Sequence, residues 1–482
     1  MNIASVDQVR AAENAAVSTG IAEYELMLRA GRGAARIIRE YFPGKQRIAV
    51  LCGGGNNGGD ALAVAALLKG DIHVFSTKKA AELTGAAGCA ARDLPEHIPF
   101  TVCESLEPEM LASFDLLIDG LLGIGFKGKS LRKNAASFIR SINCSRLPVA
   151  ALDVPSGLDC DTGDVPDQAV RADLTITFGA VKRGLLCGKG PELCGVLRTV
   201  DIGLADVSED DRAVTFEDVC RMLPRFGADV HKNRKGELLV AAGSFEYSGA
   251  AALTASAALR GGAGIVRLAT VKARPGLPFA VICREYPEQE TLPADLAVRC
   301  ADWLDRSTAL AAGPGWGNVS PGVLCGLLTF KGPVVLDADA LNLIARHPEL
   351  WQKRDNAVWT PHPGEAARLA AAFGIQAADR ETLAKELARK TGAVILLKGK
   401  FTRIASPDGR EAVILAGSPA LATAGSGDVL TGIIGALLAN GLAPFEAASA
   451  GAACHGRAGE LAGNGAVADD LLLTLKAVLK EL

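Results

Sequence analysis

Short apolar runs alternate with longer helical stretches along most of the chain. After a helical stretch of about 45 residues, these runs have the length and spacing of buried strands joined by helices. In the first half the predicted strands are Arg47–Leu51, Ile72–Ser76, Leu116–Ile118, Val149–Leu152 and Leu174–Phe178. In the second half they are Glu237–Ala241, Ile265–Ala269, Thr308–Ala311, Val334–Leu336, Val358–Thr360, Val394–Leu397 and Ala412–Leu415. The pattern predicts an α/β fold with a mostly parallel sheet in each half.

The length of the chain and one polar segment predict two domains. At 482 residues the chain is too long for one ordinary hydrophobic core. Residues Asp206–Arg212 are acidic and contain no apolar cluster, so this segment, together with the stretch up to Asp229, is interpreted as a linker region. We therefore expect one domain at residues 1–210 and another at 225–482.

Composition excludes several classes of partner. A net charge of −3 disfavours nucleic acids and anionic membranes, because both require a basic face. No secretory signal is recognised, and the most apolar stretch, Val429–Ala443, is too short and too interrupted by glycine to span a bilayer. The 12 cysteines are scattered without a C-x-x-C pair, which is typical of reduced thiols. We expect a cytoplasmic protein that binds neither nucleic acid nor membrane.

A glycine-rich turn follows the first predicted strand, in the run Gly53-Gly-Gly-Asn-Asn-Gly-Gly-Asp60. Glycines let the backbone approach a ligand, and the N-terminus of the following helix offers free N–H groups and a positive dipole, so the turn is suited to phosphate. It matches neither a Walker loop nor the regular dinucleotide fingerprint. The alternative is a tight strand–helix connection, which two asparagines and an aspartate among the glycines disfavour.

Two further predicted strands also end in an aspartate beside glycine. Asp119 opens Asp-Gly-Leu-Leu-Gly-Ile-Gly-Phe-Lys-Gly-Lys129, and Asp153 opens Asp-Val-Pro-Ser-Gly157. The carboxyl ends of parallel strands border the ligand crevice of an open α/β sheet. One such aspartate is usually a helix cap, whereas three strand ends of this kind together predict a site.

These three motifs, in this order and spacing, resemble those of the NAD(P)H-hydrate epimerase family. The resemblance implies a Rossmann-like domain that interconverts the epimers of hydrated NADH and NADPH, with Asp153 as a catalytic residue that moves protons. It implies a K⁺ ion bound by Asn57, Asp119 and Ser156, whose oxygens suit a hard cation. It implies substrate contacts from Asn56, Asn57, Gly58, Gly59, Asp60, Gly123, Ile124, Gly125, Phe126, Lys127, Gly128, Lys129 and Asp153.

The first half departs from the family pattern at Ala61, where the family commonly has glycine. A methyl group at this point of the helix either is harmless or crowds the nucleotide. A different hypothesis treats this half as a binding scaffold without catalysis. The polar residues Asn57, Asp119, Asp153 and Ser156 disfavour it, because a scaffold has no need of four such groups at one crevice.

The second half carries its own series of motifs. Gly-Pro-Gly-Trp-Gly317, Thr-Pro-His-Pro-Gly-Glu365 and Leu-Lys-Gly-Lys-Phe-Thr402 precede Ala424-Gly-Ser-Gly-Asp428. The last is a glycine-rich anion hole at a helix N-terminus with a carboxylate beside it. That pairing can stabilise negative charge and supply a general base.

This series resembles the ADP-dependent NAD(P)H-hydrate dehydratase family, which has a ribokinase-like fold. The resemblance implies loss of water from the hydrated nicotinamide, driven by ADP with Mg²⁺ as the counter-charge, and release of AMP and phosphate. It implies that Asp428 is the catalytic base. Implied contacts to the hydrated nucleotide are Ala251, Gly317, His362 and Asp428, and implied adenine-nucleotide contacts are Lys398, Gly399, Lys400, Phe401, Thr402 and Gly427.

Several alternatives remain open in the second half. A kinase of a small alcohol shares the fold, but the glycine-proline and proline-histidine motifs and the fusion to the first half disfavour it. Asp337 and Asp339 could form a metal pair or cap a helix, and an indirect structural or magnesium-water role is favoured for them. His455 is expected in the core, and His231 and Lys232 belong either to an exposed basic loop or to a ligand contact. We expect a homo-oligomer acting on the hydrates of NADH and NADPH.

Overall fold

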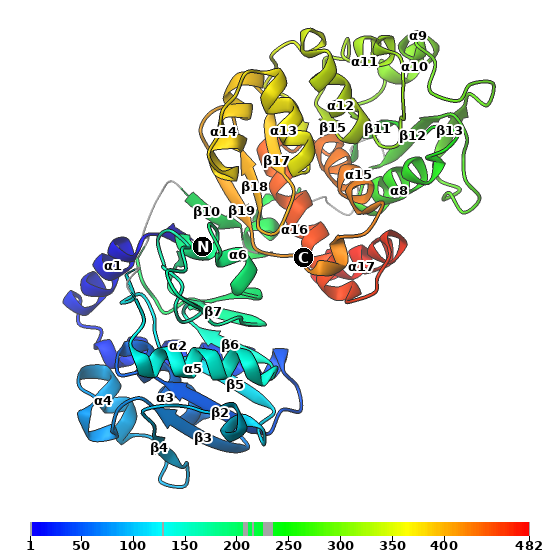
Figure 1. Cartoon of the computed structure of the whole chain (residues 1–482). Helices are drawn as coiled ribbons and strands as arrows, with labels where there is room; N and C mark the ends of the chain where they lie inside the picture. Colours follow the sequence, from blue (N-terminus) through cyan, green and yellow to red (C-terminus); the bar gives the residue numbers. More distant parts are fainter. Residues whose placement is uncertain (1, 128–129, 206–210, 215, 225–234, 482) are drawn as a thin grey trace. The chain divides into compact units, whose positions relative to one another are not determined.

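The computed structural model describes residues 2–127, 130–205, 211–214, 216–224 and 235–481 (Figure 1). The chain divides into two compact units, Met1–Asp211 and Arg212–Leu482. Each unit is built on its own mainly parallel sheet with helices packed against it. Within the described residues, no helix combines the length and the apolar character needed to cross a bilayer.

The first unit contains a parallel sheet with the strand order β4-β3-β2-β5-β6-β7-β9. The chain builds outward from β2 to β4, then returns to place β5 beside β2 and continues to β9. Ligands bind where the direction of such a sheet reverses, outside the carboxyl ends of the strands. The bounds are β2 Arg47–Cys52, β3 Asp71–Ser76, β4 Phe100–Val102, β5 Leu116–Gly120, β6 Val149–Leu152, β7 Leu174–Phe178 and β9 Val196–Val200.

The alternating side chains of β2 face two different helix layers. Ile48 and Val50 belong to the core beneath α2, α3 and α4, while Ala49 and Leu51 pack toward α5. This period of two is the consequence of the pleat in a strand buried on both faces. The helices are α1 Val6–Ser18, α2 Glu23–Tyr41, α3 Asn56–Leu67, α4 Gly85–Arg92, α5 Lys133–Ser145 and α6 Gly190–Leu193.

A small second sheet ties down the N-terminal residues. Strand β1 (Ile3–Ala4) pairs in parallel with β8 (Val181–Lys182). Helix α1 begins directly afterwards, because Ser5 forms a capping box with Gln8. The backbone N–H of Val6 donates to the Asp161 carboxylate at 2.7 Å. The N-terminal segment is therefore fixed against the β8 strand.

The second unit repeats the same building order in a larger sheet, β10-β19-β18-β17-β16-β15-β14-β11-β12-β13. Along this order, the neighbouring strands from β17 through β14 and β11 to β13 are parallel. The direction in which the chain builds the sheet reverses between β11 and β14. Strands β18 and β19 extend the sheet with antiparallel pairing. The bounds are β11 Glu237–Ala241, β12 Ile265–Thr270, β13 Ile282–Glu285, β14 Ala309–Ala312, β15 Val334–Leu336, β16 Ala357–Trp359, β17 Val394–Leu397, β18 Thr402–Ala405 and β19 Glu411–Ile414. The predicted α/β class is confirmed for both units.

Helices cover both faces of this second sheet (Figure 1). Leu238 and Val240 of β11 share a core with α8, α15, α16 and α17, whereas Leu239 and Ala241 share the opposite core with α11 to α14. The bounds are α8 Ser248–Arg260, α9 Leu296–Arg299, α10 Ala301–Leu304, α11 Pro321–Leu327, α12 Ala338–Arg346, α13 Pro363–Ala372, α14 Arg380–Thr391, α15 Ser426–Ala439, α16 Pro444–Ala462 and α17 Ala468–Glu481.

The predicted linker is wrong over two segments. Strand β10 (Asp211–Val214) lies at the edge of the second sheet beside β19, and helix α7 (Phe216–Met222) contacts α16. The buried side chains of Ala213, Val214 and Val219 hold these segments in place. Three apolar residues among charged neighbours are too sparse a signal for a strand and a helix. The rest of the predicted linker, 206–210, 215 and 225–229, lies outside the described residues, as do His231 and Lys232.

Candidate active sites

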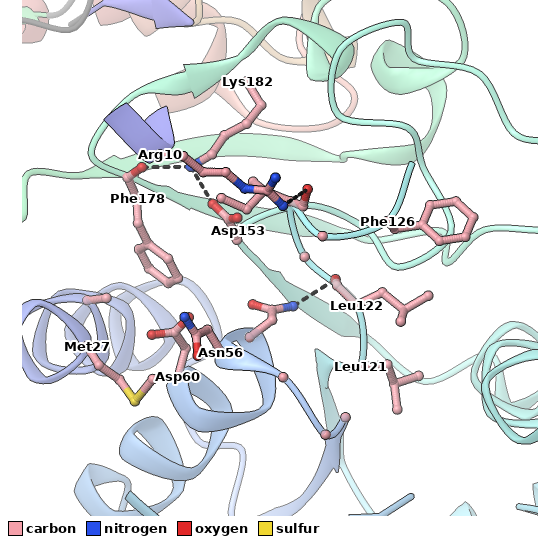
Figure 2. Close-up of a pocket in the computed structure, with 18 of the residues that line it drawn as sticks. Arg10, Met27, Asn56, Asp60, Leu121, Leu122, Phe126, Asp153, Phe178 and Lys182 are labelled. Atoms are coloured by element: carbon pink, nitrogen blue, oxygen red, sulfur yellow. Dashed lines mark hydrogen bonds and ion pairs between the residues drawn. The ribbon is translucent and has the colours of Figure 1, made fainter. Parts of the chain in front are cut away.

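The carboxyl ends of β2, β5 and β6 open on a cavity of about 920 Å³ in the first unit (Figure 2). Most of the predicted substrate-binding residues line it: Asn56, Asn57, Asp60, Gly123, Ile124, Gly125, Phe126, Lys127 and Asp153. Gly58 and Gly59 lie behind this lining in α3. A Cβ atom on Gly58 would come within 2.0 Å of the Gly53 carbonyl oxygen, and one on Gly59 within 2.5 Å of Met27 Cε. These two glycines allow close packing, and Gly128 and Lys129 lie outside the described residues.

Asp153 forms a buried ion pair at the inner end of this cavity. Its Oδ1 accepts a hydrogen bond from Lys182 Nζ at 2.5 Å, and Lys182 is only 1% exposed. The same ammonium group donates to the Phe178 carbonyl oxygen at 2.7 Å (Figure 2). Asp153 has a φ of +63°, a left-handed conformation that a non-glycine residue adopts only when its surroundings enforce it. The turn after β6 therefore holds the carboxylate in one orientation toward the cavity.

Two further carboxyl groups share the cavity with this pair. Asp60 projects from α3 and Glu13 from α1. Burial raises the pKa of Asp60 well above its ordinary range, and the negative charges of Asp153 and Glu13 raise it further. Burial also raises the pKa of Glu13, although Lys182 opposes that effect. The cavity thus combines one salt-bridged carboxylate with carboxyl groups that favour the neutral acid.

The predicted K⁺ ligands form a connected group behind the loop after β5. Ser156 Oγ lies 2.6 Å from Asp119 Oδ1, and the Ser156 N–H donates to Asp119 Oδ2 at 2.8 Å. Asn57 Nδ2 donates to the Leu122 carbonyl oxygen at 2.8 Å, and the Leu122 N–H donates to Ser156 Oγ. Burial raises the pKa of Asp119 to about 6. Asn57 Oδ1 is buried and has no hydrogen-bond partner among the described residues, so it is free to accept a cation.

In the second unit the catalytic candidate Asp428 lies in the first turn of α15. Burial raises its pKa to about 7, with a further contribution from Asp337. Asp337 itself is buried; its Oδ1 accepts from Lys398 Nζ at 2.7 Å and its Oδ2 from Thr431 Oγ1 at 2.9 Å. Although burial alone would lower the pKa of Lys398, the neighbouring carboxylates raise it. This ion pair therefore anchors the strand ends next to the Asp428 carboxyl.

Glycine and histidine residues shape the N-terminus of α15. Gly425, at the N-cap position, has a φ of +87°, and no side chain caps the helix there. A Cβ atom on Gly427 would lie 3.3 Å from Lys398 Nζ. His455 was expected in the core and is buried, but its Nε2 also lies 3.0 Å from both the carbonyl oxygen and the Oγ of Ser426. Burial lowers the pKa of His455 to about 4, so a neutral imidazole supports this helix start.

Asp337 and Asp339 make separate contacts. Asp339 Oδ2 accepts from the Gly317 N–H at 2.8 Å, and Gly317 has a φ of +65°. Asp337 occupies the N-cap position of α12, yet its side chain makes no capping bond there, so the capping alternative is wrong for this residue. Trp316 donates from its buried indole N–H to the Ala241 carbonyl oxygen at 2.9 Å. The indole thereby ties the glycine motif to β11.

The other predicted residues of this unit differ in exposure. His362 caps α13 because its Nδ1 accepts a hydrogen bond from a backbone N–H, and half of its side chain is exposed. The His362 N–H in turn donates to the Glu365 carboxylate. In the segment 398–402, Gly399 and Lys400 are exposed, whereas Phe401 is buried with a φ of +54°. Ala251 is buried against Gly243, so little of its side chain remains for ligand contact.

Comparison with known proteins covers nearly the whole chain. Residues 23–184 match the sequence model described as YjeF-related protein N-terminus, and residues 238–480 match that of NAD(P)H-hydrate dehydratase. The chain is 37% identical to the bifunctional NAD(P)H-hydrate repair enzyme of Coxiella burnetii, over 98% of each chain. The chain belongs to the bifunctional NAD(P)H-hydrate repair enzyme family. The enzyme of this name from Escherichia coli is 36% identical, over 98% of this chain and 93% of its own.

A solved structure with a ribokinase-like fold matches the second unit of this repair enzyme. A ribokinase-like superfamily protein of Enterococcus faecalis, 21% identical, superposes with a TM-score of 0.50 over 56% of this chain and 96% of its own. The ribokinase-like fold predicted for the second domain is thereby confirmed. The predicted family and its enzyme class are also confirmed, and the dehydratase match removes the support for a small-alcohol kinase.

The cavity residues of this repair enzyme that the sequence did not predict include the charged Lys182, Glu13 and Arg10. Lys182 stands in Phe-Gly-Ala-Val-Lys-Arg-Gly, where a lysine next to an arginine is typical of a solvated turn. The signal against that interpretation was the apolar run immediately before it. Glu13 and Arg10 come from α1, which precedes the matched family segment, so the motifs could not indicate them.

Ala61 does not face the nucleotide cavity. Its methyl group is fully buried, and a Cβ atom on Gly120 would lie 2.4 Å from it. The side chain therefore fills the space between α3 and the end of β5. The structure places the methyl in the core and supports the harmless alternative for this departure from the family pattern.

We expect Ala61→Gly to destabilise the first unit by about 1 kcal/mol, because glycine in a helix interior costs that much relative to alanine, and to leave the epimerisation rate unchanged. Ala66→Gly, on the half-buried part of the same helix, is the matched control for the helix-propensity loss alone. Urea unfolding and initial epimerisation rates measure the two effects. Faster epimerisation by Ala61→Gly would contradict this account of the methyl.

Proposed function

We propose that the first unit interconverts the two epimers of hydrated NADH and NADPH. The second unit then dehydrates the S epimer with ADP and releases AMP and phosphate. One observation carries this proposal: each unit places a desolvated carboxyl group close to a helix N-terminus, at the reversal point of its sheet. A helix N-terminus can bind the phosphates of a nucleotide, and a carboxyl group can transfer protons at the hydrated nicotinamide ring.

In the first unit, charge orients the substrate. The start of α3 has no side-chain cap, and Lys78, Lys127 and Arg132 line the same cavity. The pyrophosphate of the substrate would bind there, because these cationic side chains and the uncapped start of α3 attract its negative charge. The uncharged hydrated ring would then face those carboxyl groups. Asp153 is the proposed catalytic residue, and Lys182 is the proposed positioning residue that holds it.

The buried group at Asn57, Asp119 and Ser156 fits the K⁺ ion that the family resemblance implies. Asn57 Oδ1 lacks a partner among the described residues, and the Asp119 carboxyl is buried with neutral hydrogen-bond donors around it. Carbonyl, carboxylate and hydroxyl oxygens are the ligands that a hard cation prefers. When bound, the ion would neutralise Asp119 and stiffen the loop that carries Gly123 to Lys127.

Exchange of K⁺ for tetramethylammonium, which is too large for such a site, is expected to lower the melting temperature of the first unit and its epimerisation rate. A ligand at a hundredfold its dissociation constant stabilises the folded state by about 2.7 kcal/mol. Asp119→Asn should melt at the same temperature in either salt, since it removes the charge that the ion neutralises. A wild-type melting temperature that does not respond to K⁺ would contradict the cation site.

In the second unit, Asp428 would remove the proton from the hydroxyl group of the hydrate. The oxygen then attacks the β-phosphorus of ADP and AMP departs. The C–O bond breaks and phosphate leaves, while the neighbouring ring carbon loses a proton to solvent water and the ring double bond forms. The backbone N–H groups of Gly425 and Gly427, at the uncapped start of α15, would stabilise the transferring phosphoryl group. Among the described residues no cluster of three or more His, Cys, Asp or Glu side chains could hold a metal ion, so Mg²⁺ would bind mainly through the phosphates of ADP and supply their counter-charge.

The test of this function uses the full chain with both epimers of hydrated NADH, K⁺, Mg²⁺ and ADP. Complete return of the reduced-nicotinamide absorbance supports both activities. Recovery that stops after the S epimer is consumed would leave a dehydratase joined to an inactive first unit, which is the scaffold hypothesis. No recovery with either ADP or ATP would contradict the proposed reaction.

A further inference from the structure

Asp60 stands opposite Asp153 across the first cavity, and the assignment of Asp153 as the catalytic residue leaves open which proton Asp60 would transfer. Asp60 rises from the second turn of α3, whereas Asp153 follows β6 (Figure 2). Both side chains line the cavity. Asp153 is neutralised by Lys182, while Asp60 has no ion-pair or hydrogen-bond partner among the described residues. The two carboxyl groups therefore sit in very different electrostatic environments.

Such a difference separates an acid from a base. Asp153 forms a buried ion pair with Lys182 at 2.5 Å. Burial and the nearby charges of Asp153 and Glu13 favour the protonated form of Asp60. Two carboxyl groups whose surroundings push their protonation apart are the usual arrangement for acid–base catalysis by one site.

The reaction requires one proton donor and one proton acceptor. Hydration of the reduced nicotinamide puts the hydroxyl group on the ring carbon next to the ring nitrogen. Inversion of that carbon can proceed by breaking its C–O bond, with the nitrogen lone pair forming a C=N bond. The hydroxyl then needs a proton to leave as water, and the water that adds to the opposite face must lose one.

We propose that Asp60 and Asp153 act as the paired acid and base on the two faces of the hydrated ring. In one direction, Asp60 protonates the departing hydroxyl group, the C–O electron pair goes to oxygen, and water leaves. Water then adds from the face of Asp153, whose carboxylate takes the released proton. The opposite epimer reacts with the roles reversed, so no proton or electron is left unaccounted for. This inference rests on the proposed epimerase function of the first unit.

The test compares Asp60→Asn with wild type in the full chain, without ADP so that dehydration cannot contribute. We expect the rate of epimerisation above the uncatalysed rate to fall about 100- to 10,000-fold. The dissociation constant for NADH hydrate, measured by thermal shift, should change little because the phosphate end is untouched. Asp71→Asn, an exposed residue at the start of β3, is the matched control. An Asp60→Asn variant with normal turnover, or with lost binding alone, would overturn the proposal.

Isotope exchange and pH test the chemistry independently. In H₂¹⁸O, wild type should place ¹⁸O in the hydroxyl group of the epimerised product. Retention of ¹⁶O would exclude C–O cleavage and overturn the proposed step. The epimerisation rate should fall at high pH as Asp60, which lies near Glu13, Asp153 and Lys182, loses its proton. If wild type itself does not epimerise, the proposed function fails; if it does and only Asp60→Asn behaves normally, this inference alone fails.

Discussion

Replacing Asp428 by Asn is expected to lower the rate of ADP-dependent dehydration about 100- to 10,000-fold, the usual contribution of a positioned general base. The amide keeps the size of the side chain but cannot accept the hydroxyl proton. Epimerisation in the first unit should stay at the wild-type rate. The measurement is the initial return of reduced-nicotinamide absorbance from the S hydrate at saturating ADP and Mg²⁺. Asp305→Asn, an exposed substitution in the same unit, is the control.

The raised pKa of Asp428 gives this prediction a pH signature and a stability signature. Burial moves the pKa from 3.8 to about 7, and a base acts only when deprotonated, so dehydration should rise with pH and level off above about 7. The folded state holds this proton more tightly than the unfolded state does. Protonated Asp428 therefore adds to the free energy of unfolding at low pH, and this contribution is lost as the pH rises through about 7.

Asp428→Asn, which stays neutral, should consequently melt at a higher temperature than wild type at mildly alkaline pH. Loss of activity together with a gain in stability separates a catalytic role from a structural one. A variant that is inactive and less stable at that pH would contradict the role assigned to Asp428.

Replacing Asp153 by Asn is expected to remove epimerisation, again by about 100- to 10,000-fold, while dehydration of the S epimer continues. The single variant also breaks the buried pair with Lys182. Removal of one partner of such a pair costs about 3–5 kcal/mol, because a charge stays buried without compensation. A simple loss of activity would therefore be ambiguous.

The double variant Asp153→Asn/Lys182→Met resolves that ambiguity. It removes both charges of the pair, so it should recover most of the stability lost in the single variant and stay inactive as an epimerase. Urea unfolding of both variants and the epimerisation rate are the measurements. Epimerisation by the stable double variant would contradict a catalytic role for Asp153.

The strand ends of the first site could be predicted from sequence because the parallel-sheet rule brings carboxyl ends together. Asp60 and Asp153 needed only that rule to be placed at one cavity. Lys182 could not be found this way, because its burial depends on the Asp153 carboxylate, which is distant in sequence. The contacts of Trp316 and Asp337 were missed for the same reason, since their partners Ala241 and Lys398 belong to other strand ends.

Local composition gave a wrong prediction where contacts with residues distant in the sequence determine the structure. The segment around Asp211–Met222 is polar enough to suggest a linker, yet Val214 and Val219 are buried by the second unit. Ala61 illustrates the opposite case. A methyl group in a glycine-rich ligand turn suggests crowding, and only the position of Gly120 shows that the methyl points into the core.

The pairing of β1 with β8 bears on how the first unit could be engineered as a separate protein. The match to the YjeF-related N-terminus model begins at residue 23, so a boundary chosen from that match would delete β1 and α1. The shortened chain would keep its main sheet, but the substrate cavity would lose the wall that carries Glu13 and Arg10, and Lys182 would lose its neighbouring strand. An affinity tag fused directly before residue 1 would lie next to β1 and disturb its pairing with β8. Truncations and fusions are therefore better placed after β9.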